Sequence, residues 1–252
     1  MRAILLDFGG TLDHPGHWLD RFLHHYRANG IDLGRTELDA AYAHATRTAY
    51  GSDADIRHHK LGELVTYLVH HQFDHLHREG PEGIRHYLGG LGLGRQELAE
   101  RISAAFVRES REGLEKSRQV LSDLSRDFKL GVVSNFYGNL DVILVEAGIR
   151  ELIQAAIDSK HVGILKPDER IFAAALHALD VPHNQVVMVG DSLSKDIEPA
   201  HRLGMRTVWL RHGASADATG GSSKPSPEPV SPMRAGADHI ITSLEELKDI
   251  RW

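Results

Sequence analysis

The amino-acid sequence predicts an α/β protein: a Rossmann-like parallel sheet with helices on both faces, plus an inserted all-helical domain. The prediction rests on how the apolar residues are spaced. At the start of the chain and again in its second half, apolar runs of strand length alternate with segments of helical spacing. This is the pattern of a parallel sheet whose two faces are both buried. Residues 14–115 show helical spacing alone, with apolar residues recurring every three or four positions.

The strands are predicted at the apolar runs 3–6, 129–135, 186–191 and 207–210. Helices are predicted between the later strands, near 139–148, 168–179 and 194–203. Strands that alternate with helices in this way form crossover connections, so the strands should run parallel in one sheet.

The helical block interrupts this pattern directly after the first strand. We therefore expect two domains: a core made of residues 1–13 and 116–252, and a helical cap made of residues 14–115. Because the insertion leaves from the carboxyl end of a strand, the cap should lie over the edge where parallel sheets bind their ligands.

A segment rich in Gly, Ser and Pro, residues 213–237, follows the last long strand. Its composition is too polar to bury a core, and we expect a mobile loop. The fold resumes behind it with a short strand near 239–242. A helix should follow, capped by Ser243 with Glu246 three residues later.

The composition argues against several classes of partner. A net charge of −6 and an isoelectric point near 6.3 leave no basic footprint for nucleic acid or a membrane surface. No stretch approaches the roughly 20 apolar residues of a spanning helix, and no signal-peptide core is present. The sequence has no cysteine, which excludes a thiolate site and fits a reducing compartment. We expect a cytoplasmic protein.

Polar residues stand where the predicted strands end, or in the loops just after them. The candidates are Asp7, Ser134, Asn135, Lys166, Asp191 and Asp196. The carboxyl ends of parallel strands meet at one edge of the sheet, so these side chains should lie together. Asp7 can act as a nucleophile and the other two carboxylates can bind a hard cation, while the hydroxyl, amide and ammonium can neutralise anionic oxygens. Phosphoryl transfer requires this combination of groups.

The same four segments, in the same order, resemble the four motifs of the haloacid dehalogenase (HAD) superfamily. The resemblance implies that Asp7 attacks phosphorus and forms an aspartyl-phosphate. It implies that Ser134 and Lys166 hold the transferring group and that Thr11 orients the nucleophile loop. Gly10 and Asn135 would complete the substrate site, and the substrate would be a small phosphorylated metabolite.

The resemblance also implies a Mg²⁺ site. Asp7, the backbone carbonyl of Gly9 and Asp191 would bind the ion, and Asp196 would support it through water or through Lys166. Since the contact at position 9 uses only the backbone, a glycine does not disturb it.

Gly9 departs from the phosphatase pattern, in which the second residue after the nucleophile is an aspartate that protonates the leaving oxygen and activates water. Glycine can do neither. General acid–base catalysis is typically worth about 10²- to 10⁴-fold, so we expect a slowed enzyme that favours good leaving groups. A cap side chain, the substrate, Asp13 or His14 would then supply the proton, and Gly9→Asp should raise alkyl-phosphate turnover.

Two other readings stay open. The chain could be a dehalogenase- or phosphonatase-like hydrolase, although Gly9 is not the tyrosine of the former. Lys60 in the cap carries no motif typical of the Schiff-base lysine of the latter. In the second alternative, the protein is a HAD-fold binding protein that has lost catalysis. Of the 18 histidines, 12 lie in the cap. His71 and His75 lie one helical turn apart, a spacing that fits either a metal site or a solvated helix face.

Overall fold

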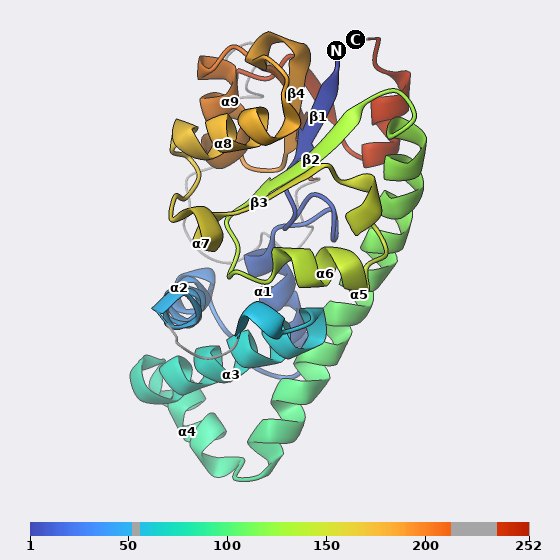
Figure 1. Ribbon diagram of the computed structural model, residues 1–252. Helices are drawn as coiled ribbons and strands as arrows, with labels where there is room; N and C mark the ends of the chain where they lie inside the picture. Colours follow the sequence, from blue (N-terminus) through green and yellow to red (C-terminus); the bar gives the residue numbers. More distant parts are fainter. Residues whose placement is uncertain (52–55, 213–235, 252) are drawn as a thin grey trace.

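The structure, a computed structural model, describes residues 1–51, 56–212 and 236–251 (Figure 1). Its centre is a parallel sheet of six strands in the order β3-β2-β1-β4-β5-β6, which confirms the predicted fold class. The strands are β1 (Ala3–Leu6), β2 (Lys129–Ser134), β3 (Ala155–Asp158), β4 (Val186–Gly190), β5 (Arg206–Leu210) and β6 (His239–Ile241). Edge strand β3 is not among the predicted strands, because its two alanines favour a strand no more than a helix.

Strand β1 lies in the middle of the sheet and is buried on both faces. Ile4 and Leu6 pack on one face in the larger apolar core, together with residues of α5 (Gly94–Leu124) and α6 (Leu140–Glu146). Leu5 points to the other face, against α8 (Glu169–Leu179) and α9 (Glu198–Arg202). Alternate side chains of β1 therefore pack in two different apolar cores. Because both faces of the strand are buried, every residue of it is apolar.

Between β1 and β2 lies a helical region, residues 18–124, which extends away from the sheet in Figure 1. Its elements are α1 (Trp18–Ala28), α2 (Arg35–Gly51), η1 (Ile56–His58), α3 (Leu61–Glu79), α4 (Glu82–Gly90) and α5. Helix α5 has 31 residues and continues without interruption through position 115, where the cap is predicted to end.

Short elements complete the fold around the sheet. They are η2 (Arg150–Leu152), α7 (Ser159–Val162), η3 (His183–Gln185), η4 (Leu193–Ile197) and η6 (Leu244–Asp249). The predicted cap of the last helix is present, since Ser243 and Glu246 form a capping box at the start of η6. Of the loop predicted at 213–237, residues 213–235 lie outside the described residues.

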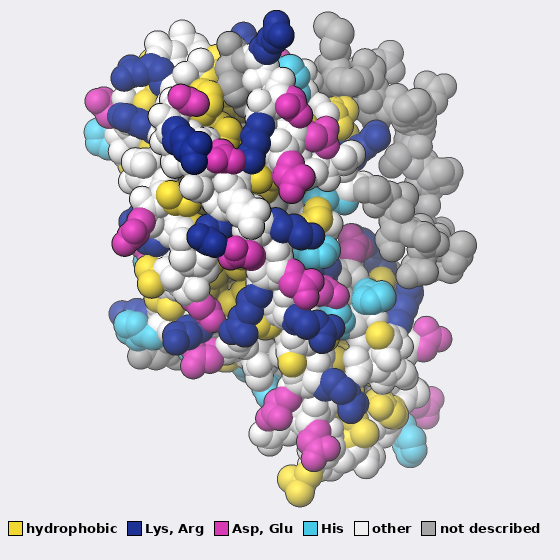
Figure 2. All heavy atoms as spheres, turned by 90° about the vertical axis from the view of Figure 1, so that its right-hand side faces the viewer, with side chains coloured by type: hydrophobic (Ala, Val, Ile, Leu, Met, Phe, Trp, Pro, Cys, Tyr) yellow, Lys and Arg dark blue, Asp and Glu magenta, His cyan; other side chains and the backbone are white. Residues whose placement is uncertain are grey.

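Helix α5 is attached to the loop that follows β1. Ser117 donates a hydrogen bond to the carbonyl of Leu12 over 2.7 Å. A Cβ atom at Gly113 would lie only 2.0 Å from the carbonyl oxygen of Asp13, so the close approach requires glycine. Figure 2 looks onto the side of the molecule that carries α5, and shows acidic and basic side chains interspersed there. None of the helices in the described part of the chain has the length and apolarity needed to cross a bilayer.

Candidate active site

Asp7 follows β1 directly and begins a tight loop. Its backbone N–H donates to the carbonyl of Val189 over 2.9 Å, and the N–H of Leu12 closes the loop onto the carbonyl of Phe8 over 2.8 Å. Gly10 has a φ of +80°, and a Cβ there would lie 2.4 Å from Asp191 Oδ2. Both the backbone conformation and the neighbouring carboxylate therefore require glycine at this turn.

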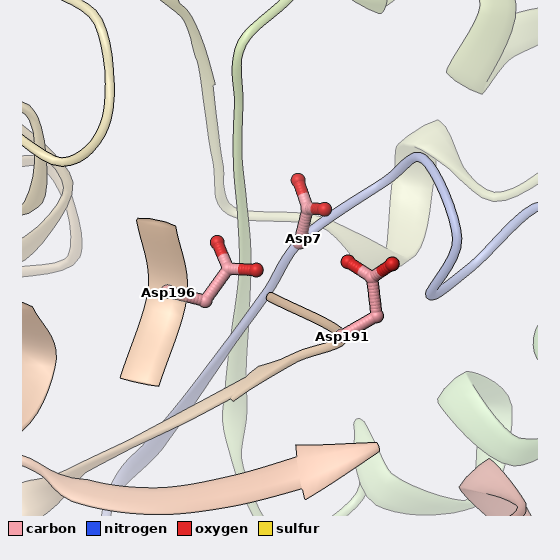
Figure 3. A group of neighbouring side chains, drawn as sticks. All are labelled: Asp7, Asp191 and Asp196. Carbon is pink, nitrogen blue, oxygen red and sulfur yellow. The ribbon is translucent and has the colours of Figure 1, made fainter. Parts of the chain in front are cut away.

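Three carboxylates converge at the ends of β1 and β4: Asp7, Asp191 and Asp196 (Figure 3). Oxygens from the three groups lie within 4.8 Å of one another. Asp191 follows β4, and Asp196 comes from η4, the turn after it. A Cβ at Gly190 would lie 2.5 Å from the Asp196 carboxyl carbon, so this approach also depends on glycine. Sheet topology has thus brought together residues nearly 190 positions apart, as predicted.

Lys166 bridges two of these carboxylates. Its ammonium donates to Asp7 Oδ1 over 2.7 Å and to Asp196 Oδ1 over 2.6 Å, and the side chain is buried. Ser134 donates to the same Asp7 oxygen over 2.9 Å. Burial alone would lower the pKa of Lys166, but the charges of Asp196 and Asp7 raise it, so the ammonium keeps its proton.

Asn135 fixes the segment that carries this lysine. Its side-chain oxygen accepts from the backbone N–H of Lys166 over 2.7 Å, and its side-chain nitrogen donates to the Lys166 carbonyl over 3.0 Å. Both polar atoms of the amide are therefore engaged with protein backbone. These two bonds fix the backbone of Lys166, and Asn135 also lines the pocket described below, so its role in binding substrate stays a prediction.

The carboxylates outnumber the cation that balances them. Burial, together with the charges of Asp7 and Asp196, raises the pKa of Asp191 to about 8. Burial also raises the pKa of Asp196 to about 6, against the opposing effect of Lys166. A hard divalent cation would relieve this excess of negative charge, and clustered carboxylate oxygens are the ligands that Mg²⁺ prefers. The oxygen donors of Asp7, Asp191 and Asp196 therefore fit the predicted ion.

A pocket of about 100 Å³ opens above these groups. Besides Asp7, Gly9, Ser134, Asn135, Lys166, Asp191 and Asp196, it is lined by His17, Trp18, Tyr42, Phe136, Tyr137, Ser192 and Lys195. The second set is absent from the sequence prediction. Phe136 and Ser192 directly follow predicted site residues, so proximity in sequence could have found them. His17 is the N-cap of α1, Trp18 lies in α1 and Tyr42 lies in α2. No sequence motif marks these three residues.

Trp18 occupies the space next to Gly9. A Cβ at Gly9 would lie 3.2 Å from Trp18 Nε1, tighter than ordinary contact. The indole is held there, because Nε1 donates to Asp13 Oδ2 over 2.8 Å and the ring meets Phe106 edge-on with centroids 5.1 Å apart. The φ of Gly9 is not in the left-handed region, so the neighbouring side chain, and not the backbone, limits what fits.

Asp13 and His14 do not line this pocket. Asp13 is fully buried and accepts hydrogen bonds from the Gly10 N–H, Trp18, Arg21 and Ser110 over 2.8 to 3.2 Å. It joins the loop after β1 to α1 and α5. His14 lines a separate groove, and burial lowers its pKa to about 4. These positions are therefore poor candidates for the proton that Gly9 does not supply.

Other residues named from the sequence also lie away from the pocket. The Thr11 N–H donates to the Phe8 carbonyl over 3.2 Å, and Thr11 lines the groove that contains His14. Lys60 is exposed at the N-cap of α3. On the same helix, His75 stacks on His44 with ring centroids 5.2 Å apart. Within the described residues, the single group with metal-ligand geometry is the cluster of Asp7, Asp191 and Asp196.

Known proteins share this sequence pattern and fold. The sequence model of the haloacid dehalogenase-like hydrolase family matches residues 1–204, and a HAD-hydrolase-like model matches residues 164–247. The mouse (Mus musculus) haloacid dehalogenase-like hydrolase domain-containing protein 3 is 32% identical over 151 residues, 60% of this chain and 55% of that protein. The phosphoserine phosphatase of Thermus thermophilus is 34% identical over 124 residues, 48% of this chain and 50% of that enzyme.

The chain thus spans about half the length of these two curated relatives. A crystal structure of a HAD phosphatase from Thermococcus onnurineus has the same fold, with a TM-score of 0.52 at 21% identity over 99% of this chain and 97% of that one. The first family match alone covers residues 1–204 of the 252. This protein therefore belongs to the haloacid dehalogenase-like hydrolase family, and it is similar to proteins named as phosphatases.

Proposed function

We propose that this protein is a Mg²⁺-dependent phosphohydrolase that acts on a small phosphorylated metabolite through an aspartyl-phosphate on Asp7. The observation that carries the proposal is the arrangement around Asp7. Lys166 and Ser134 contact one of its oxygens, while Asp191 and Asp196 lie beside it. A nucleophilic carboxylate next to an ammonium, a hydroxyl and further hard oxygen ligands suits attack on a phosphoryl group.

Each residue then has a distinct role. Asp7 attacks phosphorus through its free oxygen. Lys166 and Ser134 stabilise the anionic oxygens of the transferring group, and Asn135 holds Lys166 in place. Asp7, the Gly9 carbonyl and Asp191 would hold Mg²⁺, with Asp196 in support through Lys166. When bound, Mg²⁺ supplies positive charge that stabilises the transferring phosphoryl group.

The helical region serves as the cap of this enzyme, and Gly9 is where it departs from the phosphatase pattern. Departure of a poor leaving group and hydrolysis of the aspartyl-phosphate both benefit from proton transfer, and glycine offers none. Aryl and acyl phosphates should therefore react faster than alkyl phosphates. A burst followed by slow turnover is expected where the phosphoenzyme accumulates.

The test is turnover of aryl, acyl and alkyl phosphates with and without Mg²⁺, alongside acid-quench trapping of the phosphoenzyme. We expect activity that depends on Mg²⁺ and that Asp191→Asn removes. The exposed Asp32→Asn variant is the matched control and should behave as wild type. Mg²⁺-independent release of halide from a haloacid would contradict the proposal, as would a folded wild type that transfers no phosphoryl group.

A further inference from the structure

His17 is an imidazole in the wall of the pocket that contains Asp7 and Gly9. It occupies the N-cap of α1, where Nδ1 accepts a hydrogen bond from the backbone N–H of Leu19 over 3.2 Å. A ring nitrogen that accepts carries no proton, so the neutral ring has its proton on Nε2. None of the described residues is hydrogen-bonded to Nε2, which leaves this N–H for a bound molecule.

The surroundings keep the ring neutral. Burial is the main cause that lowers the pKa of His17, and Lys195 lowers it further. The charged and titratable groups around the ring come from several elements: Lys195, Asp20, Arg35, Asp7 and His212. Of these, Asp20 and Asp7 raise the pKa of His17 without reversing its direction.

Other polar side chains around the pocket already have hydrogen-bond partners or suit a different part of the substrate. Trp18 Nε1 donates to Asp13. The hydroxyl of Tyr137 contacts that of Thr46 at 3.4 Å, and the hydroxyl of Tyr42 is hydrogen-bonded to Tyr137. Lys195 is exposed, and its ammonium suits the non-bridging oxygens of a phosphate. Of His17, Trp18 and Tyr42, the three side chains that the helical region and its N-cap contribute to the pocket, His17 has the donor that no described residue engages.

We propose that His17 donates a hydrogen bond from Nε2–H to the leaving-group oxygen of the substrate, and so partly offsets the absence of a side chain at Gly9. This role rests on the proposed phosphohydrolase function. The bond from Asp7 to phosphorus forms and the bond from phosphorus to the leaving oxygen breaks, with its electron pair staying on that oxygen. His17 stabilises this charge but keeps its proton, and water supplies the proton that completes the alcohol. A neutral imidazole near a helix N-terminus can polarise an oxygen in this way.

The decisive variant is His17→Asn, because asparagine is a good N-cap and preserves the start of α1 while Nε2–H is lost. The substrates are phosphate monoesters whose leaving groups span a wide pKa range. We expect kcat/KM to fall about 10²-fold for alkyl phosphates and only a few-fold for activated aryl phosphates. Lys195→Met is the contrasting variant and should slow all esters equally. Since His17 keeps its proton, His17→Asn should leave the inflections of the pH profile in place.

A loss that is equal for all leaving groups, or no loss at all, would overturn the role of His17. Disappearance of an inflection in the pH profile would overturn it too, because His17 would then be titrating. Failure of the underlying function looks different: the wild type itself would form no phosphoenzyme with any ester, before any comparison between variants.

Discussion

The floor and the wall of the pocket are built by different means. The floor, made of Asp7, Ser134, Lys166, Asp191 and Asp196, is charged and hydrogen-bonded, and its residues follow strand ends or their loops. The wall, made of His17, Trp18 and Tyr42, comes from helices and is held by ring packing and by the contacts of Asp13. Strand order alone brings the floor together, whereas the wall depends on how helices pack on the sheet. We therefore expect the residues of the floor to determine whether the reaction occurs. We expect the residues of the wall to determine which substrates react.

The largest effect is expected at the floor, from Asp7→Asn. Loss of the nucleophile should lower kcat by on the order of 10⁴- to 10⁶-fold for every phosphate ester, irrespective of leaving group. The measurement is steady-state turnover together with trapping of the phosphoenzyme, and Asp32→Asn is the matched control. Retention of a tenth of wild-type activity would show that another group attacks phosphorus.

Asp13→Ala tests the connection between floor and wall. The change removes the nearer carboxylate partner of the buried Arg21 guanidinium, which lies 2.8 Å from Asp13 and 3.5 Å from Glu109. Breaking a buried ion pair on one side costs about 3–5 kcal/mol in the free energy of unfolding. Urea unfolding of this variant and of Asp32→Ala measures the difference. A cost below about 1 kcal/mol would mean that the helical region is held to the sheet elsewhere.

Gly9→Asp tests whether Trp18 in the wall limits which side chain fits at position 9, beside the floor. Trp18 lies in the space that the new side chain needs, so the single variant should gain no more than a few-fold on alkyl phosphates. Adding Trp18→Phe removes Nε1 and should allow a gain of up to about 10²-fold. The two single variants and the double variant form a cycle that measures this coupling. A full gain from Gly9→Asp alone would show that Trp18 moves freely.

The smallest effect is expected from Lys60→Met. Lys60 is exposed, its backbone N–H caps α3 through Glu63 over 2.8 Å, and its ammonium does not line the pocket. Turnover of phosphates should stay within about two-fold of wild type, as for most surface changes. Trapping with borohydride and a carbonyl substrate is the second measurement. A trapped adduct that Lys60→Met abolishes would instead support phosphonatase-like chemistry.

The sequence predicted best those positions of side chains that follow from the order of strands along the chain. Parallel strands end at one edge, so the meeting of Asp7, Ser134 and Asp191 could be predicted without knowing any packing detail, whereas Lys166 follows β3, a strand that was not predicted. The roles of Asn135 and His17 could not, because each depends on the direction of one side chain relative to a neighbouring segment. His17 is also an unusual N-cap, since short polar residues are preferred there. Boundaries within helices were equally hidden, because nothing in the apolar spacing of α5 changes near position 115.

The continuity of α5 has a mechanical consequence. The helix is fixed to the nucleophile loop near Gly113 and Ser117, and its other end lies beside α4 at the far end of the helical region (Figure 1). From Gly113 back to Gly94 the helix is roughly 28 Å long, at about 1.5 Å per residue. A rotation of the helix by about 5° about Gly113 would carry its Gly94 end, together with the helices packed against it, through roughly 2.5 Å. A small rotation of α5 at this loop would therefore displace its far end by more than the loop itself moves.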